Sequence, residues 1–170
     1  MAKSLYIANP YDKDCLNIIK NYEADYNLEG SVTAQLMASA AASLKKSLTA
    51  QNEIEQFLFL REDDTLLAGC QLQAYKDRRD CYLTLLPTTS PKQTIRLLQA
   101  VTAYAFEEQG LGMEEVFIVL DDSDGQTALS LAENGYEYLG DDDGQTHYMT
   151  DKQNYITMGR FISDGNNKKH

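Results

Sequence analysis

Apolar and polar residues follow two different periods along the chain, and each change of period marks the boundary of an expected strand or helix. Strands are predicted at residues 5–8, 57–60, 65–75, 81–86, 116–120, 136–139 and 155–161. Helices are predicted from residue 12 to the break at Asn27 and Gly30, and over residues 31–48, 90–109 and 126–133. Two helices come early and the later helices lie between strands, which indicates an α/β fold with a mixed sheet and not an all-parallel one.

Two of the helix starts carry capping residues. Asp12 or Asp14 is available as the N-cap of the first helix. In the third helix, Ser90, Pro91 and Gln93 form a capping box. We expect the Ser90 side chain to accept a hydrogen bond from the Gln93 amide, and the Gln93 side chain to reach back to the Ser90 amide.

Composition indicates one domain with its own hydrophobic core. The chain has 170 residues, of which 43% are hydrophobic and 24% charged. We expect a single domain over residues 1–162 and a flexible polar tail over residues 163–170. No window approaches the roughly 18 apolar residues of a membrane span, and the first residues do not resemble a secretory signal. Cys15, Cys70 and Cys81 are odd in number and lack metal-ligand spacing, which favours reduced thiols in the cytoplasm.

The formal net charge of −11 limits the possible ligands. An acidic domain repels phosphate backbones, so we expect no nucleic acid partner. The acidity has two interpretations. The commoner one is a solvated surface without further role, and the alternative is a field that attracts a cationic substrate such as an amine.

The order of elements resembles the GNAT superfamily of N-acetyltransferases over nearly the whole chain, and residues 110–136 carry the most specific match. In that family a strand rich in valine and isoleucine leads into a short helix that ends in a glycine and an aromatic residue. Here the strand is at 116–120, and Gly135 and Tyr136 follow the helix. The resemblance implies a GNAT-like mixed sheet flanked by about four helices. It also implies acetyl-CoA as acyl donor, a small-molecule or peptide amine as acceptor, and a homodimer paired through the late strands.

The resemblance places the acyl-CoA phosphates between the fourth strand and the third helix. It implies cofactor contacts from Leu85, Leu86, Ser90, Lys92, Gln93, Thr94, Ile95, Arg96 and Asp124. The chain departs from the family pattern in this loop, because Gln93 and Ile95 stand where the family has glycines and Pro91 lacks an amide donor. Lys92 and Arg96 lie one turn apart, where they can face a phosphate or remain solvated surface charges.

The resemblance assigns polarisation of the thioester to an amide of the fourth strand, and proton removal to a carboxylate or a water chain. Asp80, Tyr82 and Thr84 are the nearest candidates, and the sequence does not decide among them. Leu131 stands where many family members have a tyrosine that protonates the departing thiolate.

Tyr22, Glu23 and Tyr26 lie where the family often builds its acceptor pocket, between the first two helices. An aromatic and acidic lining would suit an amine, although the same residues can simply make a helix end soluble. His147 is predicted in a loop after three aspartates, without metal-ligand spacing, so we expect no metal site. Motifs of serine hydrolases, phosphate-loop NTPases and dinucleotide-dependent dehydrogenases are absent from the sequence.

Two functions of different class follow. The first is an acetyl-CoA-dependent N-acetyltransferase in which the amine attacks the thioester directly, and it rests on the resemblance. The second is a GNAT-like binding or regulatory module that has lost acyl-CoA, and it rests on Gln93, Ile95 and Leu131 in place of two glycines and a tyrosine.

Overall fold

The computed structural model describes residues 3–28, 30–46, 53–86, 90–121, 125–133 and 135–157. The strands are β1 (Ser4–Ile7), β2 (Glu53–Glu62), β3 (Thr65–Tyr75), β4 (Asp80–Leu85), β5 (Glu115–Asp121), β6 (Glu137–Asp142) and β7 (Gln145–Asp151). The helices are α1 (Lys13–Asp25), α2 (Ser31–Lys46), α3 (Pro91–Phe106), α4 (Gly125–Glu133) and α5 (Lys152–Thr157). The predicted order is confirmed as far as β6. The expected tail over residues 163–170 lies outside the described residues.

The seven strands form one sheet in the order β1-β2-β3-β4-β5-β7-β6. Every neighbouring pair is antiparallel except β4 and β5, which are parallel. A parallel pair cannot be joined by a tight turn, and α3 supplies the crossover between these two strands. The predicted mixed sheet is therefore confirmed.

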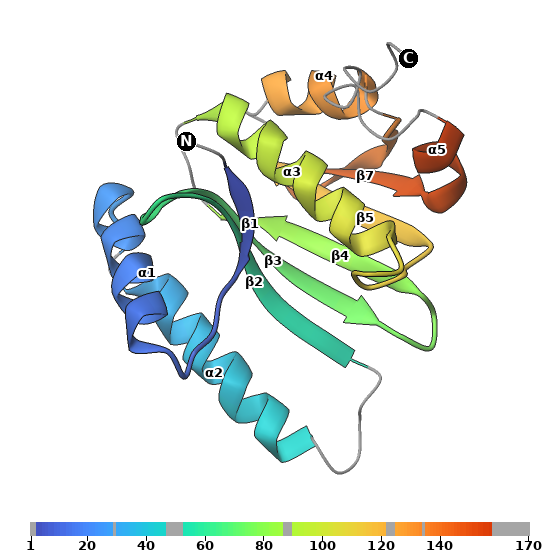
Figure 1. Ribbon diagram of the computed structural model, residues 1–170. Helices are drawn as coiled ribbons and strands as arrows, with labels where there is room; N and C mark the ends of the chain where they lie inside the picture. The colour runs from blue at the N-terminus through green and yellow to red at the C-terminus, as the bar shows by residue number, and fades with distance from the viewer. Residues whose placement is uncertain are drawn as a thin grey trace, which may run out of the picture.

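Helices cover both faces of the sheet, but they cover them unequally (Figure 1). The larger hydrophobic core lies under α3, with α4 and α5 beside it, and includes Leu72, Leu83, Leu98, Val101 and Ile118. The smaller core joins α1 and α2 to the other face, and includes Ile19, Tyr22, Val32, Phe57 and Phe59. Its buried strand residues come from β2 and β3, and Tyr6 of β1 packs against them. None of the helices in the described parts of the chain combines the length and apolar character needed to cross a membrane.

The capping residues act as predicted at α1 and only in part at α3. Asp12 is the N-cap of α1, and its side chain accepts the Asp14 amide at 2.9 Å. At α3 the Ser90 side chain accepts the Gln93 amide at 3.4 Å, with Pro91 in the first helical position. The predicted return bond from Gln93 is wrong, because its side-chain oxygen is buried and accepts no hydrogen bond from any described residue. The capping box is thus half-formed.

The end of the described chain differs from the prediction. Asp143 and Gly144 have φ values of 52° and 76°, so the expected acidic loop is a tight hairpin turn between β6 and β7. The last strand is therefore β7, and the strand predicted over residues 155–161 is wrong where the structure describes it. Residues 152–157 form α5 instead, because the Asp151 side chain caps that helix by accepting the Asn154 amide at 2.8 Å.

Gly69 allows β3 to pass close beneath a buried aromatic ring. A methyl group at this position would lie 2.6 Å from the ring of Phe59 and 2.9 Å from Leu86. Phe59 has no exposed surface, so its ring cannot swing into solvent. We expect Gly69→Ala to lower the free energy of unfolding by about 1–3 kcal/mol, measured by urea titration. Adding Phe59→Leu should recover part of that loss, and strictly additive losses would contradict the steric explanation.

Candidate functional site

The first turn of α3 lies beside the carboxyl ends of the two parallel strands. The chain leaves β4 at Leu85 and enters α3 at Pro91, so only a short connection separates them (Figure 1). A helix N-terminus attracts anions through its free amides and its dipole. The structure therefore brings most of the predicted cofactor residues to one place, from Leu85 to Arg96. Asp124 lies outside the described residues.

Backbone donors at this helix start are scarce. Pro91 has no N–H group, and the Gln93 amide already donates to the carbonyl of Ser90 at 3.1 Å and to its hydroxyl at 3.4 Å. The Thr94 side chain is buried and donates to the same carbonyl at 3.3 Å. Lys92 therefore contributes the one first-turn N–H that is not bound to another described residue.

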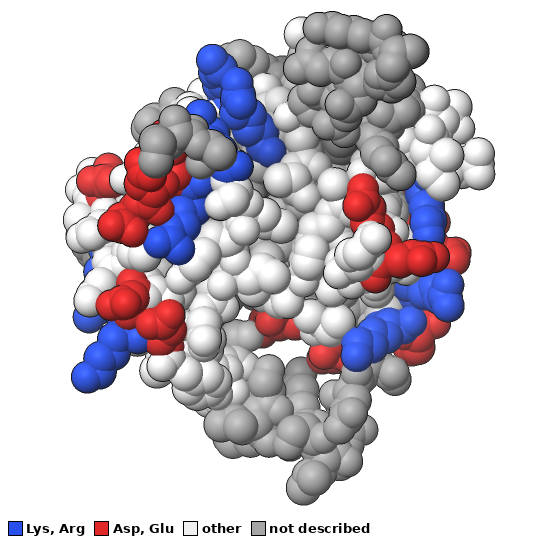
Figure 2. Space-filling model, in the orientation of Figure 1, with Lys and Arg blue, Asp and Glu red and all other residues white. Residues whose placement is uncertain are grey.

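Two cationic side chains lie in the first turns of α3, where few backbone amides are available to an anion. Lys92 and Arg96 are both exposed, and neither forms an ion pair within the described part of the chain. Figure 2 shows lysine and arginine side chains grouped over this end of α3. Because cations near a helix N-terminus oppose the dipole, their presence here is most favourable when an anion binds between them. Ile95, in one of the family's glycine positions, is half-buried and offers only apolar surface.

At the end of β4, one backbone amide faces the parallel neighbour β5. The Leu86 amide donates to the Gly69 carbonyl on β3 at 2.9 Å, so it is not available to a thioester. Alternate residues of a strand turn their N–H groups toward opposite neighbours. The Leu85 amide consequently faces β5, where the parallel ladder ends with Thr84 opposite Val119.

The three candidate catalytic residues of β4 are spread along the strand. Asp80 lies at the end remote from α3, where it is nearly buried and paired with Arg78 at 3.3 Å. The Tyr82 hydroxyl donates to the same carboxylate at 3.4 Å. Burial and the nearby Asp80 raise the pKa of Tyr82, so this hydroxyl stays protonated and cannot act as a base. Thr84 is exposed and lies closest to the start of α3.

His147 joins this region although the sequence pattern placed it in a loop. It lies in β7 opposite Val119, which in turn lies opposite Thr84. The three side chains therefore form a row on one face of the sheet. The Asp-Gly pair at residues 143–144, followed by the β-favouring residues Thr146, Tyr148 and Thr150, is the sequence signal that could have placed His147 in a strand.

Comparisons with known proteins agree with this architecture. No protein-family model matches the sequence, and curated proteins give no significant match. The spermidine/spermine N-acetyltransferase SpeG from Vibrio cholerae matches with a TM-score of 0.64 at 13% identity, over 92% of this chain and 98% of that one. The N-acetyltransferase PseH from Campylobacter jejuni matches with a TM-score of 0.56 at 12% identity, over 88% and 98% of the two chains. The PaiA N-acetyltransferase from Thermoplasma acidophilum, solved with coenzyme A, matches with a TM-score of 0.57 at 14% identity, over 89% and 99%.

This protein has the GNAT N-acetyltransferase fold. Within this GNAT fold, Leu131 of α4 is buried in the larger core and supplies no proton. Tyr136, the next aromatic residue, is also buried, and its hydroxyl is hydrogen-bonded to Thr102. No tyrosine from this segment therefore replaces the general acid that many GNAT enzymes carry on α4.

The residues of α1 that were predicted to bind the acceptor are engaged in packing and hydrogen bonds within the protein. Tyr22 is buried and packs its ring against Tyr26 and Phe59, with ring centres 4.9 Å and 5.6 Å apart. Glu23 is 3% exposed, and its carboxylate accepts the Thr33 amide at 2.7 Å and the Thr33 hydroxyl at 2.9 Å. These bonds cap the first turn of α2. A hollow of about 600 Å³ adjoins them, lined by Lys20, Glu23, Ala24, Asn27, Gly30, Thr33 and Ala34.

Neither two buried thiols nor a cluster of metal-ligating side chains adds reactive chemistry to the described residues. Cys70 and Cys81 are buried without exposed surface, and burial raises the pKa of the Cys81 thiol to about 12. Neither thiol can therefore serve as a nucleophile near neutral pH. In the described residues no three histidine, cysteine or acidic side chains gather where they could hold a metal ion.

The Glu23 bonds predict a role in stability. Glu23→Ala removes the cap of α2 and leaves the Thr33 hydroxyl without its acceptor, so it should lower the free energy of unfolding by about 1–2 kcal/mol. Asp25→Ala is the matched control, because Asp25 is exposed on the same helix and should change stability by less than about 0.5 kcal/mol. Denaturant titrations that find both variants equally stable would contradict the capping role.

Proposed function

We propose that this protein is an acetyl-CoA-dependent N-acetyltransferase in which an amine attacks the thioester directly. The observation that carries the proposal is the likeness of its fold to solved N-acetyltransferases over 88–92% of the chain. The likeness establishes the fold, and the activity is our inference from it and from the residues at the start of α3. We further propose that residues 1–162 act as one domain.

The residues beside the parallel junction fit an anionic acyl donor through side-chain charge. Lys92 and Arg96 would bind phosphate oxygens, with the Lys92 amide as the accompanying backbone donor. The Leu85 amide faces the junction of β4 and β5, where it would orient the acyl group. When bound, acetyl-CoA supplies the activated acyl group, and these residues hold and orient it.

The row at the end of the parallel strands supplies a proton acceptor. Of Thr84, Val119 and His147, the histidine is the one residue of a type that commonly serves as a general base in enzymes. We assign it the proton that the amine loses during attack, and Thr84 the role of a neighbouring hydrogen-bonding group. Asp80 is unsuited to this step, because it lies four residues from Thr84, about 13 Å along the strand.

The remaining expectations belong to the same proposal. An amine acceptor agrees with the net charge of −11, and SpeG is named as a spermidine/spermine N-acetyltransferase. A cytoplasmic location agrees with three cysteines that are all unpaired and buried. A homodimer paired through the late strands is supported by β6, an edge strand on which Tyr138 and Leu139 are 54% and 49% exposed.

A calorimetric titration with acetyl-CoA tests the proposal. We expect saturable binding in the micromolar range, weakened about tenfold in the double variant Lys92→Ala, Arg96→Ala because two phosphate contacts are lost. The double variant Lys13→Ala, Lys76→Ala is the matched control, since it removes two exposed cations from elsewhere on the surface.

Two results would contradict this assignment. An absence of heat at millimolar acetyl-CoA would exclude the enzyme and favour a binding module without cofactor. Equal weakening by both double variants would show that net charge acts on the ligand, and not a site at the start of α3.

A further inference from the structure

Half of one sheet face has no helix over it within the described residues. The smaller core that fixes α1 and α2 draws its strand residues from β1, β2 and β3, so β4, β5 and β7 are left open on that side. Thr84 on this half is exposed, and Tyr82, Phe117, Met149 and His147 are only half-buried. The strand register arranges the open side chains in three rows that cross β4, β5 and β7.

The first row is Thr84, Val119 and His147, at the carboxyl ends of the parallel strands. It lies nearest to the start of α3 and so to the proposed acyl donor. An amine that reacts there must place its nitrogen over this row, and the rest of the molecule must extend along the open face.

The second row provides an apolar floor. Tyr82 lies opposite Phe117, and their rings stack with centres 4.9 Å apart. Met149 continues the row on β7. Covering half-buried apolar surface with an apolar ligand is favourable. A methylene chain is suited to cover this row.

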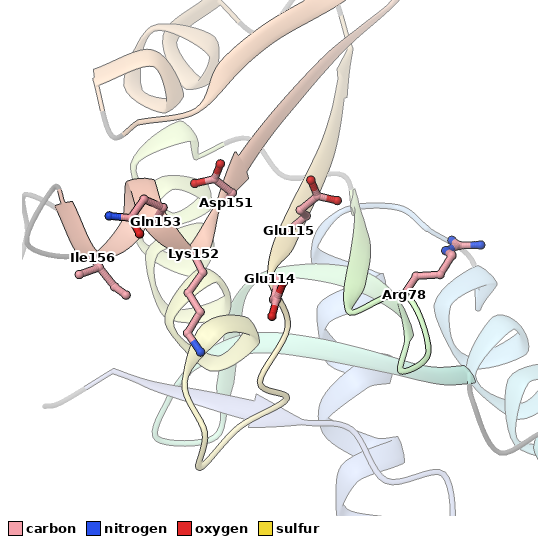
Figure 3. Close-up of a pocket in the computed structure, with 7 residues that line it drawn as sticks. All are labelled: Arg78, Glu114, Glu115, Asp151, Lys152, Gln153 and Ile156. Carbon is pink, nitrogen blue, oxygen red and sulfur yellow. The ribbon is translucent and has the colours of Figure 1, made fainter.

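The third row carries negative charge that the described residues do not neutralise. Glu115 lies directly opposite Asp151, and Figure 3 shows both carboxylates extended to the same side of the sheet. Like charges directly opposite each other destabilise a strand pair. Neither residue forms an ion pair with a described residue, whereas Asp80 in the same row is paired with Arg78. Among the described residues, the Asp151 side chain accepts a hydrogen bond from the Asn154 amide alone, at 2.8 Å.

The surroundings of this pair leave room for a cation. A hollow of about 560 Å³ adjoins Glu115 and Asp151, and it is also lined by Arg78, which is paired with Asp80. Glu114 and Lys152 line the same hollow but extend to the other side in Figure 3, and Glu114 is paired with Arg79 at 3.3 Å. An ammonium group bound between Glu115 and Asp151 would remove their mutual repulsion.

We propose that the open face binds an extended aliphatic amine with a second positive charge, its far end held by Glu115 and Asp151 and its reacting end placed at Thr84 and His147. The outer rows are four residues apart, about 13 Å along the strands. An extended chain advances about 3.5 Å for every three single bonds, so this span corresponds to about eleven bonds between the two nitrogens. The reaction at the near end rests on the proposed acetyltransferase function, and the binding does not.

Calorimetric titrations without acetyl-CoA test the binding. The probes are 1,10-diaminodecane, the shorter 1,4-diaminobutane, and 10-amino-1-decanol, which has the longer chain but a single charge. We expect 1,10-diaminodecane to bind about tenfold more tightly than either other probe. The double variant Glu115→Gln, Asp151→Asn should abolish this difference, while asparagine still caps α5. Glu114→Gln is the matched control and should leave the difference intact.

The outcomes separate this inference from the acetyltransferase itself. Equal affinity for the three probes, or a preference that survives in Glu115→Gln, Asp151→Asn, overturns the inference. Mass spectrometry then follows acetyl transfer from acetyl-CoA to each of the three probes. Selective binding without transfer would contradict the proposed activity and leave the binding site established. Transfer that ignores chain length and charge would support the activity and overturn the site.

Discussion

The parallel pairing of β4 and β5 is the constraint on which the rest of the molecule depends. Parallel strands require a crossover, and α3 provides it on one face, so the helix start meets the carboxyl ends of both strands. The larger core then forms under α3. On the other face, Phe57 and Phe59 of β2 hold α1 and α2 to one side. The same topology therefore creates an anion-attracting helix start and an uncovered strip of sheet on opposite faces of one junction.

Within the described residues, unpaired positive charge lies at the start of α3, and unpaired negative charge lies on the opposite face of the sheet. The chain carries a net charge of −11, yet Lys92 and Arg96 stand unpaired by described residues at the start of α3. On the other face of the sheet, Glu115 and Asp151 lie opposite each other, and neither forms an ion pair with a described residue. Two ligands of opposite charge could thus approach the junction from opposite faces without competing. A glycine-rich loop would bind phosphate through backbone amides, but Ser90 and Pro91 withdraw those donors here. In the proposed binding mode, side-chain cations bind the phosphates instead, which makes the affinity more sensitive to salt.

Local sequence signals predicted what local interactions control. The order of helices and strands along the chain as far as β6, an aspartate cap at Asp12 or Asp14, and the Ser90–Pro91 start of α3 follow from periodicity and capping. The errors arose where tertiary contacts decide. Tyr155, Ile156 and Thr157 are residue types that favour strands, but they belong to α5, where Tyr155 packs against Phe106 with ring centres 5.1 Å apart. Glu23 resembles a substrate ligand in sequence, and its bonds to Thr33 ten residues away could not be foreseen. His147 entered the candidate site only through its register with Val119.

The central claim is that an acyl-CoA donor binds where α3 begins beside the parallel strands. Nuclear magnetic resonance of the uniformly nitrogen-15-labelled protein, titrated with acetyl-CoA, tests it most directly because every non-proline amide reports its own surroundings. The largest amide shifts should fall on Leu85, Lys92, Gln93 and Arg96 and should saturate together. Saturable shifts confined to α1, α2 or the β6 edge, or no shifts at millimolar acetyl-CoA, would contradict it.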